Sequence, residues 1–234
     1  MIATLLLFAG AGAAELPDDF VYLRDVAPAI IQDIRYVGSY NFTGAPVPGY
    51  EAAECMLTAK AAAALRAADA ELAERGLGLI VWDCYRPARA VAAFMTWTRI
   101  GPDTMKPVFY PNEPRETLVA RDYIAEHSGH SGGSVVDLGI APRGYLPKPR
   151  AVVLACTAPQ DDDLPDMGTA FDCFDAASAL EAPVTAIQST NRTLLRSTME
   201  RHGFAPYHAE WWHFRLIDQP HEGSEFDVPV RAKP

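Results

Sequence analysis

The segment Val135-Val136-Asp137-Leu138 places a carboxylate inside an apolar run that reads as a buried strand. Burying a carboxylate without a partner is costly, so any fold of this chain must bring a cation, a buried arginine or backbone donors to Asp137. The stretch before the strand, 128–134, holds three glycines and His130. Such a glycine-rich turn can fold back on itself, so His130 is expected to lie over the strand that presents Asp137.

A second segment, Glu210-Trp211-Trp212-His213-Phe214, carries another carboxylate and another imidazole three residues apart. In a regular strand an odd spacing points side chains to opposite faces. Glu210 and His213 can therefore share a site only if the backbone bends or bulges there, or if the glutamate lies just outside the strand. The alternative is a surface Glu210. Trp211 and Trp212 are expected to be packing residues that wall the site.

Taken together, His130, Asp137, His213 and Glu210 have the composition of a catalytic zinc site. Such a site has three protein ligands, an open fourth position and a carboxylate that handles protons. A single histidine is more often a surface or satisfied core residue than a ligand. The prediction of a zinc-dependent hydrolase therefore rests on the combination.

The segment Asp83-Cys84-Tyr85-Arg86-Pro87 follows an apolar run and precedes a helix, a common position for site residues. Arg86 brings a permanent positive charge. In an amide hydrolase this charge can stabilise the oxyanion that develops on the attacked carbonyl. The alternative is a structural ion pair between Arg86 and an acidic neighbour.

The overall charge of the chain excludes some partners. The 234 residues carry a formal charge of −10. This charge repels phosphate backbones, which argues against nucleic acid, and it argues against docking on anionic lipid. The length fits one domain, and the oligomeric state is not predicted.

The first residues resemble a secretory signal. Residues 1–14 have Thr4 as their one polar side chain, an apolar core and a small-residue end, and cleavage after Ala13 fits best. The run is too short for a membrane span, which needs about 20 apolar residues, so no stable membrane insertion is expected. Residues 14–234 would then form a single catalytic domain in the periplasm or outside the cell. The segment lacks Lys and Arg; if it is instead a buried strand or helix, the protein is cytoplasmic.

The four cysteines also bear on the compartment. In an oxidising environment they can form two disulfides with three connectivities. We expect Cys55–Cys84 and Cys156–Cys173, because each pair joins neighbouring elements. The alternative is four buried thiols. The absence of a CxxC pair argues against a structural zinc ribbon.

The pattern along the chain predicts an α+β fold with a central antiparallel sheet flanked by helices. Helices are expected at 58–75, 87–98 and 191–202, with loop at 101–118. Strands are expected at 77–82, 134–140, 151–156, 204–207 and 211–216.

The motifs just described resemble those of the D-alanyl-D-alanine dipeptidases of the vancomycin-resistance type, within the zinc D,D-peptidase family with a hedgehog-like fold. The combination of SxHxxGxxxD with ExxH is specific, whereas either half alone is weak. The resemblance covers nearly all of the chain after residue 14. Its further positions are Tyr36, Asn41-Phe42-Thr43-Gly44, Gly49-Tyr50, Tyr110-Pro111-Asn112, Met167-Gly168, Phe171-Asp172, Asn191-Arg192, Leu195-Arg196-Ser197 and Phe226-Asp227.

This resemblance implies hydrolysis of the D-Ala-D-Ala dipeptide to D-alanine, with peptidoglycan turnover as its setting. His130, Asp137 and His213 would bind one zinc ion, which lowers the pKa of its bound water toward about 7. Glu210 would act as the general base and return the proton to the leaving amine. Arg86 would share the oxyanion charge with zinc.

The resemblance also implies how the small zwitterionic substrate is bound. Tyr36 and Asp172 lie where its ammonium is recognised, and Ser128 lies where a hydroxyl can meet its carboxylate. Asp172 has an alternative role as a turn or capping residue. Three departures put selectivity in doubt: Gly132 where some relatives have arginine, Cys84 where glycine is common, and a long segment 141–166.

Two other functions are kept open. The first is a D,D-carboxypeptidase or endopeptidase acting on peptidoglycan stem peptides; a lid formed by 141–166 would exclude it. The second is a non-catalytic wall-binding module. Glu210 and Arg86 argue against the module, because metal binding alone needs neither.

Overall fold

The computed structural model describes residues 15–148, 154–160 and 163–233. The predicted signal segment 1–13 lies outside the described residues. The elements, in chain order, are β1 (Phe20–Tyr22), α1 (Leu23–Val26), β2 (Ile31–Gln32), β3 (Met56–Thr58), α2 (Ala59–Ala73), β4 (Leu77–Asp83), α3 (Ala88–Ile100), α4 (Lys106–Phe109), the 3-10 turn η1 (Arg115–Thr117), the 3-10 turn η2 (Gly129–Gly132), β5 (Val135–Pro142), the 3-10 turn η3 (Ala176–Ser178), α5 (Ala186–Arg201), β6 (Phe204–Tyr207) and β7 (Glu210–Leu216).

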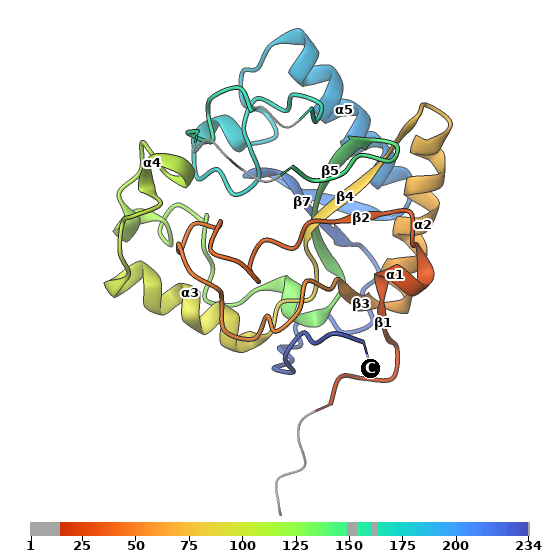
Figure 1. Ribbon diagram of the computed structural model, residues 1–234, viewed down its shortest axis with the longest axis horizontal. Helices are drawn as coiled ribbons and strands as arrows, with labels where there is room; N and C mark the ends of the chain where they lie inside the picture. Colours follow the sequence, from red (N-terminus) through yellow and green to blue (C-terminus); the bar gives the residue numbers. More distant parts are fainter. Residues whose placement is uncertain (1–14, 149–153, 161–162, 234) are drawn as a thin grey trace, which may run out of the picture.

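A five-stranded sheet with the order β2-β4-β5-β7-β6 forms the centre of the described molecule, and β1 pairs with β3 in a smaller sheet. Figure 1 shows α2 on one side of the central strands and α3 and α4 on the other. The mixed α+β prediction is confirmed. The antiparallel prediction is correct for three of the four pairings, but β2 runs parallel to β4. That edge strand has two residues, too few to leave a periodic signal in the sequence.

Helix α2 shows why the long elements were predictable. The Thr58 hydroxyl accepts the Ala61 N–H and caps the first turn, and Gly76 follows the end with a φ of +72°. Leu65 and Leu72 recur at helical spacing among small alanines and are fully buried. The alanines let the helix pack closely on β4, which is apolar from Leu77 to Trp82.

Three predicted elements need correction. Helix α5 begins at Ala186 instead of 191, since Thr185 and Gln188 form a reciprocal capping box. Residues 101–118, expected as loop, contain α4 and η1; both are too short to show periodicity. Of the strand expected at 151–156, residues 151–153 lie outside the described residues and the remaining three are not in a strand.

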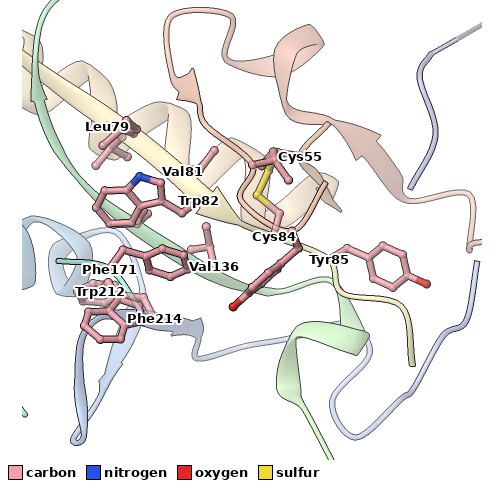
Figure 2. Packing of buried hydrophobic residues seen from close by; sticks show 14 of the residues in the cluster. Cys55, Leu79, Val81, Trp82, Cys84, Tyr85, Val136, Phe171, Trp212 and Phe214 are labelled. Carbon is pink, nitrogen blue, oxygen red and sulfur yellow. A yellow bond between two sulfur atoms is a disulfide. The ribbon is translucent and has the colours of Figure 1, made fainter. Parts of the chain in front are cut away.

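Two disulfides join parts of the core. The structure pairs Cys55 with Cys84 and Cys156 with Cys173, the two pairs that the sequence analysis names. Figure 2 shows the Cys55–Cys84 bond beyond the end of the buried strand that carries Val81 and Trp82. No helix among the described residues has both the length and the apolar character to cross a membrane.

Candidate functional site

The central strand β5 brings the candidate site together. Its register sets Asp137 opposite Asp83 on β4 and opposite His213 on β7. Just before β5, the turn η2 carries His130, and Gly133 ends this turn in the left-handed region at a φ of +75°. The chain thus folds back as expected, and His130 Nε2 lies 3.4 Å from Asp137 Oδ2.

A bulge in β7 solves the spacing problem of Glu210 and His213. Along the β6–β7 ladder, Pro206 pairs with Phe214 and the next residue, Tyr207, already pairs with Glu210. Three residues of β7 therefore have no partner on β6, and the strand bends there. The bend lets both side chains face one cavity, where Glu210 Oε2 lies 3.5 Å from His213 Nδ1.

His130, Asp137 and His213 converge as candidate metal ligands. One donor atom from each lies within 4.8 Å of the others, and the described residues hold no second such cluster. Asp137 Oδ1 is buried and has no hydrogen-bond partner, although His213 Nδ1 is 3.0 Å away. A buried carboxylate with one imidazole nitrogen beside each oxygen matches the donor set that zinc prefers. The residues therefore fit the ion that the sequence predicts.

Electrostatic effects differ among the buried carboxyls. Burial opposes ionisation of Asp137, but the two neighbouring histidines hold its pKa below its usual range. Burial, and then the charges of Asp137 and Asp172, raise the pKa of Glu210 well above its usual range. A raised pKa suits a group that accepts and returns a proton near neutral pH.

Arg86 lies in the same cavity between two carboxylates, Asp83 and Asp137, and its Nη2 is 3.5 Å from Asp137 Oδ2. Its Nε and Nη2 each lie 2.8 Å from Asp83 Oδ2, and its guanidinium stands 5.4 Å from the Tyr36 ring centre. Burial disfavours its charge, but the neighbouring negative groups, Asp83 first, raise the pKa of Arg86 well above its usual value. The pair with Asp83 is the structural ion pair that the sequence allowed as an alternative role for Arg86. Arg86 also lines the cavity, however. The pair therefore orients the guanidinium within the site.

The remaining candidate residues are the hydrogen-bonded pair Tyr36 and Asp172, and Ser128. Tyr36 lines the cavity and its hydroxyl donates to both oxygens of Asp172, at 3.2 and 3.0 Å, whereas Asp172 lies behind it and is not a lining residue. Asp172 is buried, and its burial raises its pKa well above the usual range. Ser128 lines the cavity, and its Oγ accepts the His130 N–H at 3.3 Å, which caps η2.

Sequence reasoning missed two parts of the site. Asp83, which holds Arg86, was visible as a carboxylate ending an apolar strand, the same signal that identified Asp137. The cavity, of about 220 Å³, is also bordered by residues 122–125, His127 and Tyr207. Those residues gave no signal, because loop positions reach the cavity only through tertiary packing.

The departures in sequence also have structural reasons. A Cβ on Gly132 would come within 2.7 Å of the His221 backbone oxygen, so the C-terminal segment fills the space that a side chain would need. No described residue of 141–166 lines the site cavity, and several of them line a different one. The described part of that segment therefore does not form the lid that would have excluded longer peptides.

Three clustered metal-ligating side chains, a buried carboxylate and a guanidinium in one cavity define the class: a metal-dependent hydrolase. A family model described as D-ala-D-ala dipeptidase matches residues 17–146 and 149–231. The chain belongs to this family and is a metallopeptidase.

Similar proteins agree with that assignment. The D-alanyl-D-alanine dipeptidase of Enterococcus faecium is 36% identical over 91% of this chain and 98% of its own. Its counterpart in Streptomyces coelicolor is also 36% identical, over the same shares. A solved LD-carboxypeptidase aligns with a TM-score of 0.41 at 16% identity, covering 87% of this chain and 70% of that one. A likeness this weak carries no argument here.

Proposed function

We propose that the protein is a zinc-dependent dipeptidase that hydrolyses D-Ala-D-Ala to free D-alanine. The observation that carries the proposal is the buried carboxylate of Asp172, which accepts the Tyr36 hydroxyl and forms no ion pair within the described part of the chain. A substrate ammonium supplies that cation. The similar proteins, which are D-alanyl-D-alanine dipeptidases by name, support the same substrate.

His130, Asp137 and His213 would hold the zinc ion. When bound there, zinc supplies a Lewis acid that polarises the scissile carbonyl and acidifies the attacking water. The buried, unpartnered oxygen of Asp137 supports this assignment, because a cation offsets its burial cost.

Glu210 accepts the proton of the attacking water and passes it to the leaving amine. Its carboxylate lies beside the candidate ligand His213 and lines the cavity. Its raised pKa favours the first half of this transfer, since a carboxylate of ordinary pKa is a weaker base toward water, while the protonated carboxyl is still acidic enough to protonate an amine.

Arg86 stabilises the negative charge that develops on the carbonyl oxygen. Asp83 fixes the guanidinium through Nε and Nη2. Nη1 makes only a long hydrogen bond to Ser128 Oγ, at 3.5 Å, which a carbonyl oxygen of the substrate can replace. A donor held in place before reaction costs little reorganisation when the charge appears.

The substrate's ends are bound by separate groups. Tyr36 and Asp172 take the ammonium, and the Ser128 hydroxyl meets the carboxylate. Since Ser128 Oγ already accepts a backbone N–H, its own hydrogen is free to be donated. The cavity of about 220 Å³ supports a small substrate, because it falls below the roughly 300–1,000 Å³ of ordinary ligand pockets.

The alternatives are less well supported. In a D,D-carboxypeptidase or endopeptidase, the residue before the scissile bond has an acylated nitrogen, and Asp172 would then stay buried without a cation. A wall-binding module would need neither the base Glu210 nor the oriented Arg86.

We also propose that residues 14–234 form one catalytic domain that works in the periplasm or outside the cell. One hydrophobic cluster runs from Leu23 to Val230, which supports a single domain. Two disulfides support export, because such bonds persist in oxidising compartments.

The test supplies zinc-loaded protein with D-Ala-D-Ala, N-acetyl-D-Ala-D-Ala, L-Ala-L-Ala and a stem pentapeptide, and measures released alanine. We expect release from D-Ala-D-Ala alone. Release from the acetylated dipeptide or the pentapeptide at a comparable rate would favour the carboxypeptidase. No release from any of them would sink the enzymatic proposal.

The matched variant for the base is Glu210→Gln, which keeps the size of the side chain. It should bind zinc like wild type and lose most of its kcat. Full activity in a zinc-loaded Glu210→Gln protein would remove the proposed base.

A further inference from the structure

Each disulfide ends directly beside a candidate site residue. Cys84 follows Asp83, and Cys173 follows Asp172. We propose that the two disulfides are positioning crosslinks with separate tasks: Cys55–Cys84 orients the metal ligand His130, and Cys156–Cys173 orients Asp172 toward the substrate ammonium. This inference rests on the proposed function for the roles of His130 and Asp172.

The first crosslink acts through the backbone of Cys84. Its carbonyl oxygen lies 2.7 Å from His130 Nδ1. A carbonyl oxygen can only accept, so Nδ1 carries the proton and Nε2 keeps its lone pair. Nε2 is the nitrogen that faces Asp137 Oδ2. The Cys84 carbonyl thus fixes both the tautomer and the direction of the ring, as partners of metal-bound imidazoles do.

The Cys84 carbonyl lies beyond the β4–β5 ladder, which ends one residue earlier with the pair Asp83–Asp137. Its peptide unit is held instead by the segment of Cys55, because the Tyr85 N–H of that unit donates to Met56 O at 3.0 Å. Cys55 is a fixed point: its N–H donates to Gln32 Oε1 at 2.8 Å, and its carbonyl accepts the Leu23 N–H at 2.9 Å. Figure 2 shows the bond that ties Cys84 to this point.

The second crosslink acts on the turn that presents Asp172. This aspartate has a φ of +61°, in the left-handed region that non-glycine residues adopt when their surroundings impose it. Cys156 supplies part of those surroundings. Its N–H donates to Val108 O at 2.7 Å, its carbonyl accepts the Ala170 N–H at 2.8 Å, and its sulfur holds Cys173.

The two crosslinks therefore predict different losses. Freeing Cys84 lets the His130 ring turn, which weakens zinc binding. Freeing Cys173 lets the Asp172 carboxylate move away from the ammonium, which weakens substrate binding. A merely structural role would lower thermal stability in both cases without separating these two quantities.

The experiment compares Cys55→Ala/Cys84→Ala with Cys156→Ala/Cys173→Ala in the full chain. Zinc affinity is measured by chelator competition, without any use of activity, and KM and kcat are measured at saturating zinc. We expect the first pair to lose about 10-fold or more in zinc affinity, the scale of an outer-shell partner, with KM within about twofold of wild type. We expect the second pair to keep its zinc affinity and to raise KM for D-Ala-D-Ala about 10-fold, since a small displacement of a positioning group costs this much.

Each variant serves as the control of the other. If a double variant does not fold, Cys55→Ser and Cys156→Ser break the same bonds with a single change. Equal effects of both variants on both quantities, or no effect of either, would overturn the inference. If wild type releases no alanine from D-Ala-D-Ala, the proposed function fails and the assignment of the second crosslink falls with it, whereas the zinc measurement still judges the first.

Discussion

Asp137 is the site residue that most needs a cation as a partner. It is 2% exposed, one of its oxygens has no hydrogen-bond partner, and its register places it between two other ionisable side chains. A residue in this position contributes more to ligand binding than to the stability of the fold, because its full set of partners is completed only by a cation.

Replacing Asp137 with asparagine should therefore act on zinc binding. We expect Asp137→Asn to lower zinc affinity by more than about 100-fold, because even outer-shell partners contribute about 10- to 100-fold. The matched control is Asp69→Asn, where the carboxylate is also buried but accepts the Leu79 N–H at 2.9 Å and pairs with Arg143 at 2.7 Å. That variant should keep its zinc affinity and lose about 1–3 kcal/mol of stability. Chelator competition and urea unfolding measure the two effects; wild-type zinc affinity in Asp137→Asn would contradict the assignment.

Replacing Arg86 with lysine should lower kcat. Lysine has one ammonium group and cannot pair with Asp83 through two nitrogens while offering another to the substrate. We expect Arg86→Lys to lower kcat by about 10²–10³, the usual loss of one oxyanion donor, with unchanged zinc affinity. Arg89→Lys is the control, since Arg89 makes an exposed pair with Asp227 one turn away. Equal kcat values in the two variants would show that Arg86 is a structural ion pair.

For single residues, the sequence indicated which side chains carry the chemistry better than it indicated which side chains they contact. His130 and Asp137 were identifiable because their separation is short and crosses a glycine-rich turn. Asp83 was not identified, because its position beside Asp137 depends on the β4–β5 register. The backbone of Asp172 was equally hidden, since its left-handed φ is imposed by contacts from distant parts of the chain.

The loop that carries Asp172 is held by one helix. Arg192 of α5 donates to three backbone carbonyls, those of Met167, Ala179 and Ala177, at 2.7, 2.8 and 2.8 Å. Burial lowers the pKa of Arg192 to about 10. Arg192 uses its guanidinium to bind three neutral carbonyls. We infer that this contact maintains the shape of the loop and does not serve as an ion pair.

Replacing Arg192 with methionine should loosen that loop. We expect Arg192→Met to cost about 3 kcal/mol, because at least one of the carbonyls is left buried without a donor. Arg196→Met on the same helix is the control. Arg196 pairs with Glu181 and Glu200 on the surface, so its loss should stay within about 0.5 kcal/mol. Denaturant unfolding compares the two, and equal losses would contradict the special role of Arg192.

Elements with strong local signals were predicted, and those set by tertiary contacts were not. The helix at 59–73 has a cap, a periodic apolar face and a terminal glycine. The start of α5 was misplaced although Thr185 and Gln188 gave a capping signature, because the first turn has the exposed Ile187 and no apolar face. The bulge in β7 left no sequence signal beyond the awkward spacing of Glu210 and His213.

At the scale of the whole molecule, the C-terminal segment 226–230 connects several elements next to the site. Phe226 N–H donates to Ser131 O, and its carbonyl accepts the Ala88 N–H. Further along, the Val228 carbonyl and N–H both bond the Tyr85 hydroxyl, and Val230 bridges to Tyr50. This segment therefore contacts the turn of His130, the start of α3 and Tyr50, whose hydroxyl donates to Asp83 Oδ1 at 2.6 Å. Local pattern cannot foresee such a segment, because it has no periodicity of its own.

Away from the site, α2 and α5 pack against each other beside the sheet, and Glu71 links them. Its carboxylate pairs with Arg201, and its Oε2 lies 3.0 Å from His202 Nε2. The pKa of Glu71 is lowered from its usual 4.5 to about 2, and the hydrogen bonds from Arg201 are the largest cause. A depressed folded-state pKa means that the ionised form stabilises the fold, and that this contribution is lost as the pH falls from about 4.5 toward 2.

The pH dependence of global stability should reveal this link. We expect Glu71→Gln to be less stable than wild type by at most about 1 kcal/mol above pH 4.5, because the pair is largely solvated and screened. The difference should shrink as the pH falls below 4.5 and vanish near pH 2, where wild-type Glu71 is itself half protonated or more. Glu74→Gln removes the same charge from the end of the same helix, where no ion pair is found among the described residues, and should show no such trend. Urea unfolding from pH 2 to 7 measures both differences. A Glu71→Gln deficit that stays constant across that range would mean that Glu71 contributes through packing and not through its charge.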